Sequence, residues 1–168
     1  MAMARQLWLL RHADAEPHGT RPDAERRLTE RGRRQAEVAG TAVARMAVKF
    51  EAILASPKAR ARETAELALG QMEDSQRELL DLHPLLAGGV HAREALDLLD
   101  GVGVGGPALL VGHEPDLSGI VGELTGARVD LKKGGLVLVR LGAGGAQLVL
   151  LLRPVELSLI AGLALEAI

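Results

Sequence analysis

The chain has 168 residues, close to the ~150 of a typical domain, so we expect a single domain over residues 1–168. Apolar residues make up 48% of it but aromatic residues only 1%, namely Trp8 and Phe50, which argues against a platform for stacking single-stranded nucleic acid. With 20 basic and 22 acidic residues the formal net charge is −2, so no nucleic-acid partner is expected and any phosphate binding must be local.

The chain contains no cysteine, which excludes thiol nucleophiles, thiolate zinc sites, iron–sulfur clusters and disulfides. The first apolar run covers only residues 7–10 and stops at Arg11, too short for a signal peptide or a membrane span. The most apolar stretch, residues 134–152, is interrupted by Arg140, Gln147 and several glycines, so it predicts a hairpin rather than a membrane helix. We expect a cytoplasmic protein with no membrane partner.

The first predicted strand is the continuous apolar run of residues 7–10, a pattern typical of a strand buried on both faces of a sheet. The first predicted helix starts after Thr29, a good N-cap, because apolar residues then recur at helical spacing to about Lys49. Gly32 and Gly40 weaken this helix, since glycine has a poor helix propensity.

A second strand is predicted over residues 50–55. Ser56 followed by Pro57 then predicts the N-cap and first residue of a helix that runs to about residue 69. Arg60 would lie in the first turn of this helix.

The second half of the chain continues the alternation of strands and helices. Its predicted elements are a strand at 78–82, a helix at 92–99, a strand at 108–111, a helix at 115–124, a hairpin of 136–141 with 147–152, and a terminal helix or disordered tail from 155 to 168. The order predicts an α/β fold: a three-layer sandwich with a mostly parallel central sheet flanked by helices and a C-terminal β-hairpin.

Charged and polar side chains follow three of the predicted strands. They are Arg11 with His12, the segment from Ser56 to Arg60, and His113. Ligands of open α/β sheets bind beyond the carboxyl ends of the strands, so these groups should share one rim. Arginine donates parallel hydrogen bonds to a phosphoryl group, and imidazole can donate, accept or attack.

Four segments of the chain, three of which contain these residues, resemble the histidine phosphatase superfamily, whose fold is called phosphoglycerate mutase-like. They are Leu9 to Ala15, Arg26 to Gly32, Ser56 to Thr64, and Val111 to Pro115. Their order and spacing are similar to those of the short SixA-type phosphohistidine phosphatases, and the resemblance runs from about Leu7 to the end of the hairpin.

The resemblance implies that His12 is a nucleophile that forms a phosphohistidine intermediate. It implies that Arg11, Arg60 and His113 form the phosphate pocket and neutralise the charge of the transferring oxygens, so that no cofactor or metal is needed. Arg26 and His18 match positions of substrate contacts, although an exposed loop residue is an equal interpretation of His18. The nearby arginines should lower the pKa of His12 and keep it neutral.

Two departures from the family pattern stand out. Ala13 replaces a usual glycine, which is harmless if its φ is negative. No acidic residue in residues 77–84 matches the general acid of the ester-cleaving branches, which favours phosphohistidine over an ester substrate because a departing alkoxide needs a proton more. Five carboxylic acids remain as possible donors: Asp14, Glu16, Glu78, Asp81 and Glu114.

Other interpretations stay open beside a phosphatase for protein phosphohistidine. One is a phosphatase for small phosphate esters or anhydrides, and another is a phosphate-binding module without turnover. The spacing of His12 and Asp14 permits a metal site, which the neighbouring arginines disfavour. Gly101, Gly103 and Gly106 fit a dinucleotide motif but follow a helix and precede a strand, so they predict a loop.

The basic stretch from Arg21 to Arg34 is a candidate for attracting an acidic, phosphorylated signalling protein, although a balanced charged face is the simpler interpretation.

Overall fold

The computed structural model describes residues 4–103 and 105–164. The strands are β1 Arg5–Arg11, β2 Ala52–Ala55, β3 Leu80–Leu82, β4 Pro107–Gly112, β5 Leu136–Gly142 and β6 Gly145–Leu152. The α-helices are α1 Glu30–Arg45, α2 Ala59–Leu69, α3 Asp74–Arg77, α4 Ala92–Gly101, α5 Asp116–Thr125 and α6 Pro154–Ala161, and the 3-10 helices are η1 Asp23–Glu25 and η2 Pro84–Ala87.

The six strands form one sheet in the order β3-β2-β4-β1-β5-β6. The first four strands of the chain are parallel to one another, whereas β5 pairs antiparallel with β1 and β6 antiparallel with β5. The mostly parallel α/β sheet with a late hairpin is therefore confirmed.

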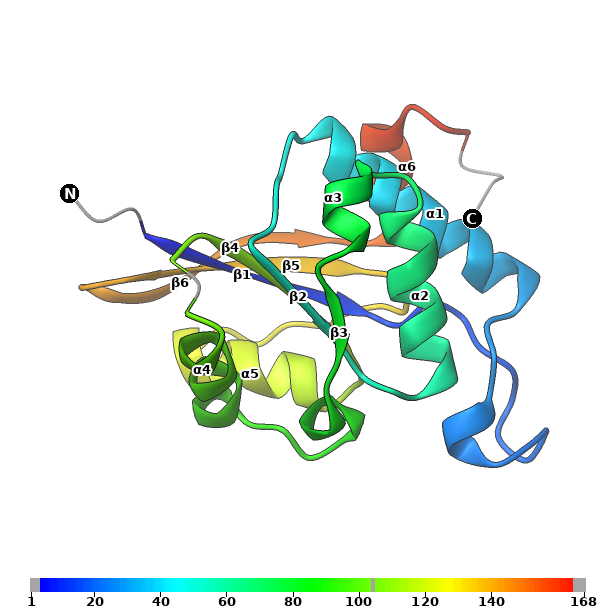
Figure 1. Cartoon of the computed structure of the whole chain (residues 1–168), viewed down its shortest axis with the longest axis horizontal. Helices are drawn as coiled ribbons and strands as arrows, with labels where there is room; N and C mark the ends of the chain where they lie inside the picture. The colour runs from blue at the N-terminus through cyan, green and yellow to red at the C-terminus, as the bar shows by residue number, and fades with distance from the viewer. Residues whose placement is uncertain (1–3, 104, 165–168) are drawn as a thin grey trace.

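Helices cover both faces of the sheet, with α1, α2 and α6 on one side and α4 and α5 on the other (Figure 1). The apolar run of β1 serves both layers, because successive side chains of a strand point to opposite faces. Trp8 and Leu10 pack with α1, α2 and α6, and Leu7 and Leu9 pack with α4 and α5. The three-layer sandwich thus follows from one continuous apolar run.

Two glycines that weaken the sequence prediction of α1 are required by its packing. A Cβ on Gly40 would lie 2.0 Å from the carbonyl oxygen of Ala68 in α2, and a Cβ on Gly32 would lie 1.9 Å from that of Asp14. Both positions bring α1 against neighbouring backbone. Glycine lowers the helix propensity at these two positions, but it allows α1 to approach the neighbouring backbone closely.

Several predicted boundaries were wrong. Helix α1 ends at Arg45 rather than near Lys49, and Ala47 follows with a φ of 55°, which a continuing helix cannot contain. Helix α2 begins at Ala59 with Lys58 as its N-cap, so Ser56 is not the cap. The Ser56 hydroxyl instead lies 2.7 Å from a histidine ring nitrogen, a contact between segments that local sequence does not reveal.

The strand predicted over residues 78–82 is present as β3, which covers only Leu80–Leu82. Three short helices were missed: α3, η1 and η2 each contain four residues or fewer. Segments this short carry too few apolar positions for a periodic pattern. A terminal helix or a disordered tail was predicted for residues 155–168. The structure has helix α6 in the first part of this segment, and residues 165–168 lie outside the described residues.

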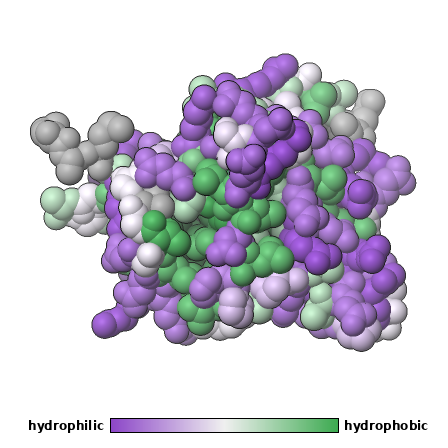
Figure 2. Space-filling model, in the orientation of Figure 1, coloured by the Kyte–Doolittle hydropathy of each residue, from purple (hydrophilic) through white to green (hydrophobic). Residues whose placement is uncertain are grey.

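Hydrophilic side chains surround an apolar area over the β3 edge of the sheet, as Figure 2 shows. Leu82, at the end of β3, and Leu85, in η2, are among the large apolar residues that stay exposed. Within residues 4–103 and 105–164, no helix has both the length and the apolarity that crossing a membrane requires.

We expect Gly40→Ala to lower the free energy of unfolding by about 1–3 kcal/mol, because the new methyl group meets backbone that side-chain rotation cannot move away. Urea denaturation measures this change. Gly119→Ala in α5 is the matched control: a Cβ there meets nothing within 4 Å, so stability should stay equal or rise. Equal stability of Gly40→Ala and wild type would contradict the packing argument.

Candidate active site

The two histidines of the site are brought together by neighbouring parallel strands. Arg11 at the end of β1 is in register with Gly112 at the end of β4, so the residues that follow, His12 and His113, lie side by side. The His12 backbone N–H donates to the Gly112 carbonyl at 3.0 Å, and the centroids of the two imidazole rings are 5.2 Å apart. Pairing of two strands distant in sequence thus creates the centre of the site.

A cavity of about 230 Å³ opens at this end of the sheet, and we call it the histidine cavity. All six residues singled out in the sequence line it, namely Arg11, His12, His18, Arg26, Arg60 and His113. Five further residues complete its wall: Ala15, Glu16, Pro17, Glu114 and Lys133. The prediction that these charged side chains share one rim agrees with this placement.

The backbone fixes the hydrogen of the His12 ring. Nδ1 lies 2.8 Å from the carbonyl oxygen of Ala13, and a carbonyl only accepts, so Nδ1 carries the hydrogen and donates it. The lone pair is then on Nε2. Ala13 itself adopts no positive φ, since Ala47 is the single non-glycine residue of the described chain that does, and the methyl group in place of glycine causes no strain.

Both imidazoles are held neutral. Burial, assisted by Arg60, Arg11 and Lys133, lowers the pKa of His12 to about 4. Burial, with the nearby charges of His12, Arg60 and Lys58, lowers the pKa of His113 to about 3. The arginines act in the expected direction on His12, but exclusion of water is the larger cause.

Asp23, which the sequence analysis did not single out, organises the basic side chains. Its carboxylate accepts hydrogen bonds from Arg26 at 2.9 Å and Arg60 at 3.3 Å and lies 3.2 Å from the Lys58 ammonium. Arg60 also donates to the Asp23 carbonyl at 2.7 Å. Hydrogen bonds, first from Arg26, hold the pKa of the Asp23 carboxyl well below its usual value. The carboxylate therefore stays charged and fixes these groups.

Three buried nitrogen atoms of the site have no hydrogen-bond partner in the protein. They are Nε of Arg11, Nε of Arg60 and Nδ1 of His113; across the described residues only one other buried side-chain atom, on Arg5, shares this property. An unpaired buried polar group costs about 1–3 kcal/mol, so such groups are rare outside functional sites. These three nitrogen atoms belong to residues that line the same cavity, which is therefore rich in polar nitrogen groups that the protein leaves without a partner.

A loop before β5 adds a cation that the sequence analysis missed. The Gly134 N–H donates to the carbonyls of Arg11 and His12 at 3.2 and 3.1 Å, and Arg11 Nη1 donates to the Leu131 carbonyl at 2.8 Å. Gly134 has a φ of 72°, which favours glycine. These bonds place Lys133 at the cavity. In the sequence, two lysines followed by two glycines directly before the predicted hairpin are the pattern that could have pointed to Lys133.

Only some of the five candidate proton donors lie at the histidine cavity. Glu16 and Glu114 line the histidine cavity, whereas Glu78 and Asp81 do not. Asp14 is bound by Lys133 at 3.0 Å and by the Thr29 hydroxyl. Glu16 accepts from the Arg27 backbone, which above all lowers its pKa and keeps it ionised.

No cluster of three His, Cys, Asp or Glu residues that could hold a metal ion is found in the described parts of the chain.

We expect His12 to titrate with a midpoint of about 4, because its protonated form is buried beside cations. Since an unfolded histidine titrates at 6.5, acidification between 6.5 and 4 protonates the unfolded chain first and lowers the free energy of unfolding. Nitrogen-15 NMR of labelled histidines measures the midpoint and shows which ring nitrogen carries hydrogen.

His91 serves as the internal control, because its hydrogen bond with Glu123 raises the pKa of its ring and should move its midpoint in the opposite direction. A His12 midpoint at or above that of His91 would overturn the electrostatic description of the cavity.

A family model for the histidine phosphatase superfamily (branch 1) matches residues 7–96. An uncharacterized protein of Picosynechococcus sp. is 31% identical over 153 residues, covering 84% of this chain and 88% of that protein.

Two solved structures have the same fold. The protein histidine phosphatase SixA complexed with tungstate has a TM-score of 0.77 at 23% identity, covering 90% of this chain and 99% of that one. A putative phosphohistidine phosphatase SixA from Nakamurella multipartitia has a TM-score of 0.74 at 27% identity, covering 90% and 97%.

The family match includes three of the four sequence motifs, and the strand pairing of β1 with β4 brings the fourth, with His113, to the same cavity. The chain belongs to the histidine phosphatase superfamily, branch 1, and has the phosphoglycerate mutase-like fold of the SixA-type phosphatases.

Proposed function

We propose that this chain is a single-domain, metal-independent phosphatase that removes phosphate from histidine on a protein through a covalent phospho-His12 intermediate. The observation that carries the proposal is the neutral His12 ring, with its lone pair on Nε2, in the same cavity as Arg11, Arg60 and His113. Membership of the superfamily supports phosphate hydrolysis as the class of reaction.

The geometry supports a two-step transfer. Nε2 of His12 attacks phosphorus, and the bond from phosphorus to the substrate imidazole breaks in line with the attack. Arg11 and Arg60 neutralise the equatorial oxygens. Water then cleaves the phospho-His12 bond, which releases inorganic phosphate and returns the imidazole to its neutral form.

His113 contributes as a hydrogen-bond donor. Its Nε2 lies 2.7 Å from the Ser56 hydroxyl, whose oxygen accepts from the Lys58 N–H at 3.2 Å. If the hydroxyl hydrogen is donated to Nε2, the ring hydrogen is on Nδ1, the atom that has no partner in the protein. Ser56 is then a positioning residue for the phosphate contact of His113.

The choice of phosphohistidine over an ester rests on the leaving group. A substrate imidazole can take a proton from solvent on its far ring nitrogen and leave as a neutral molecule, so it needs no enzymatic acid. An alkoxide needs a proton at the breaking bond, where a positioned acid contributes about 10²–10⁴-fold. Ionised Glu16 cannot supply that proton.

Hydrolysis of small phosphate esters or anhydrides is the second candidate, and Glu114 is the observation that favours it. This carboxyl lines the histidine cavity and is hydrogen-bonded by the backbone N–H and the hydroxyl of Ser118. A third candidate, a phosphate-binding module without turnover, needs the same cavity but no phosphoenzyme.

We expect the protein to release phosphate from a phosphohistidine peptide but not from the matching phosphoserine peptide, in excess EDTA. Rapid acid-free quenching with a radiolabelled substrate should trap an acid-labile, alkali-stable phosphoenzyme. His12→Ala should abolish both signals while circular dichroism shows an intact fold.

Equal turnover of the phosphoserine peptide would favour the ester candidate and Glu114 as its acid. Phosphate binding without a phosphoenzyme would favour the binding module.

We expect Ser56→Ala to lower kcat/KM for the phosphohistidine peptide roughly tenfold, the value of one hydrogen bond of about 1.4 kcal/mol. The nitrogen-15 spectrum of His113 should change at the same time, because its Nε2 loses the hydroxyl. An unchanged His113 spectrum with reduced activity would show that Ser56 acts only through stability.

A further inference from the structure

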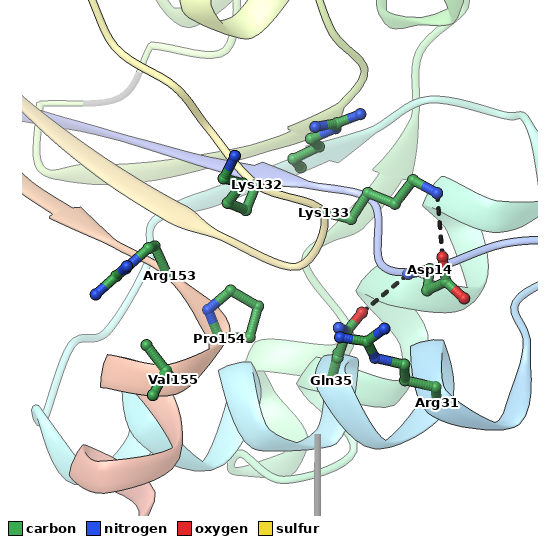
Figure 3. Close-up of a pocket in the computed structure, with 9 residues that line it drawn as sticks. Asp14, Arg31, Gln35, Lys132, Lys133, Arg153, Pro154 and Val155 are labelled. Atoms are coloured by element: carbon green, nitrogen blue, oxygen red, sulfur yellow. Dashed lines mark hydrogen bonds and ion pairs between the residues drawn. The ribbon is translucent and has the colours of Figure 1, made fainter. Parts of the chain in front are cut away.

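A second and larger cavity of about 600 Å³ adjoins the histidine cavity, and we call it the basic cavity. Figure 3 shows its wall: Arg31 and Gln35 come from α1, Lys132 and Lys133 from the loop before β5, and Arg153 with Pro154 from the start of α6. Arg11 and Lys133 line both cavities, so the two cavities lie next to each other and share these side chains.

Positive charge dominates the basic cavity although the chain as a whole has a net charge of −2. Five cationic side chains line it against the single carboxylate of Asp14. Three of them have acidic partners: Lys133 with Asp14 at 3.0 Å, Lys132 with Asp130 at 2.6 Å, and Arg153 with Glu156. The cations therefore remain in excess after these pairs are counted.

In the part of the chain that the structure describes, Arg31 is the clearest example of a cationic side chain in this cavity without an acidic partner. Its side chain is exposed on α1, and within the described residues no hydrogen bond or ion pair engages it. Arg11 contributes a second incomplete group, since its Nε is buried without an acceptor. Asp14 acts on Arg31 only through its charge, and Asp14 is already bound by Lys133. Arg31 and Arg11 Nε therefore both keep the capacity to donate hydrogen bonds to an anionic ligand.

The size and the lining residues of the basic cavity also indicate which kind of anionic molecule fits it. A cavity of about 600 Å³ exceeds the needs of one tetrahedral ion. None of its lining residues is aromatic, so it offers no stacking surface for a nucleobase. Pro154 and Val155 provide an apolar part of the wall. Mixed apolar and cationic walls suit a peptide segment that carries carboxylates.

We propose that the basic cavity binds an acidic segment of the substrate protein, with Asp or Glu residues that flank the phosphohistidine. This inference rests on the proposed function and adds the substrate class: a phosphohistidine next to carboxylates. Arg31 and Lys132 are specificity residues outside the reacting atoms, whereas Arg11 and Lys133 contact both parts of the substrate.

The test compares two phosphohistidine peptides that differ only in flanking Asp and Glu against Asn and Gln. Wild type should have a KM about tenfold lower for the acidic peptide, with similar kcat, and this preference should weaken as salt is added. Arg31→Glu combined with Lys132→Glu should remove the preference and leave the neutral peptide unaffected.

Arg33→Glu combined with Arg93→Glu is the matched control, because it makes the same change in charge at residues that line neither cavity. Free phosphohistidine is the third substrate. Its hydrolysis tests the proposed function alone, since it has no flanking residues. Equal KM values for the two peptides in wild type, with free phosphohistidine hydrolysed, would overturn the inference but not the proposed function.

Binding of the unphosphorylated acidic peptide, measured by fluorescence anisotropy, tests the basic cavity independently of any hydrolysis. Binding that is lost in Arg31→Glu with Lys132→Glu but kept in the control supports the basic cavity as an acidic-segment site even if no phosphohistidine is hydrolysed. Binding that is equal in all three proteins, or absent from wild type, overturns it.

Discussion

The parallel pairing of β1 with β4 is the interaction on which the rest of the site depends. Its register aligns Arg11 with Gly112 and so places His12 and His113 next to each other. Side chains buried on both faces of β1 hold this register, because a slip of one residue would turn the large Trp8 ring away from α1, α2 and α6 and into the layer that Leu7 and Leu9 fill. The packing of the core thereby fixes the position of His12 relative to His113.

Burial then decides the chemistry of that pair. Removing both rings from water lowers the pKa of each and keeps them neutral among cations. The same burial leaves donors of Arg11, Arg60 and His113 without acceptors, which costs stability in the free protein. Asp23, ionised and hydrogen-bonded to Arg26 and Arg60, holds the cations in place without filling the cavity.

The loop of Lys132 and Lys133 connects the reacting centre with its surroundings. Glycine at position 134 lets the loop hydrogen-bond to the carbonyls of Arg11 and His12, and this contact sets Lys133 between the histidine cavity and the basic cavity. Residues of both cavities are thus fixed to the same strand end. In an α/β sheet such loops can vary in charge without disturbing the strands beneath them.

The sequence alone determined the layers, the mostly parallel sheet and four cavity residues at strand ends, Arg11, His12, Arg60 and His113, because apolar runs and the residues that follow them are local patterns. Arg26 and His18 were predicted only from the resemblance to the family. Only the tertiary structure decided that Ser56 contacts His113 rather than capping α2, that Asp23 and Lys133 join the site, and that Gly32 and Gly40 serve packing. Each of these depends on contact between segments far apart in the chain. The pKa values of the histidines belong to the same group, since burial is a property of the folded molecule and not of neighbouring residues in sequence.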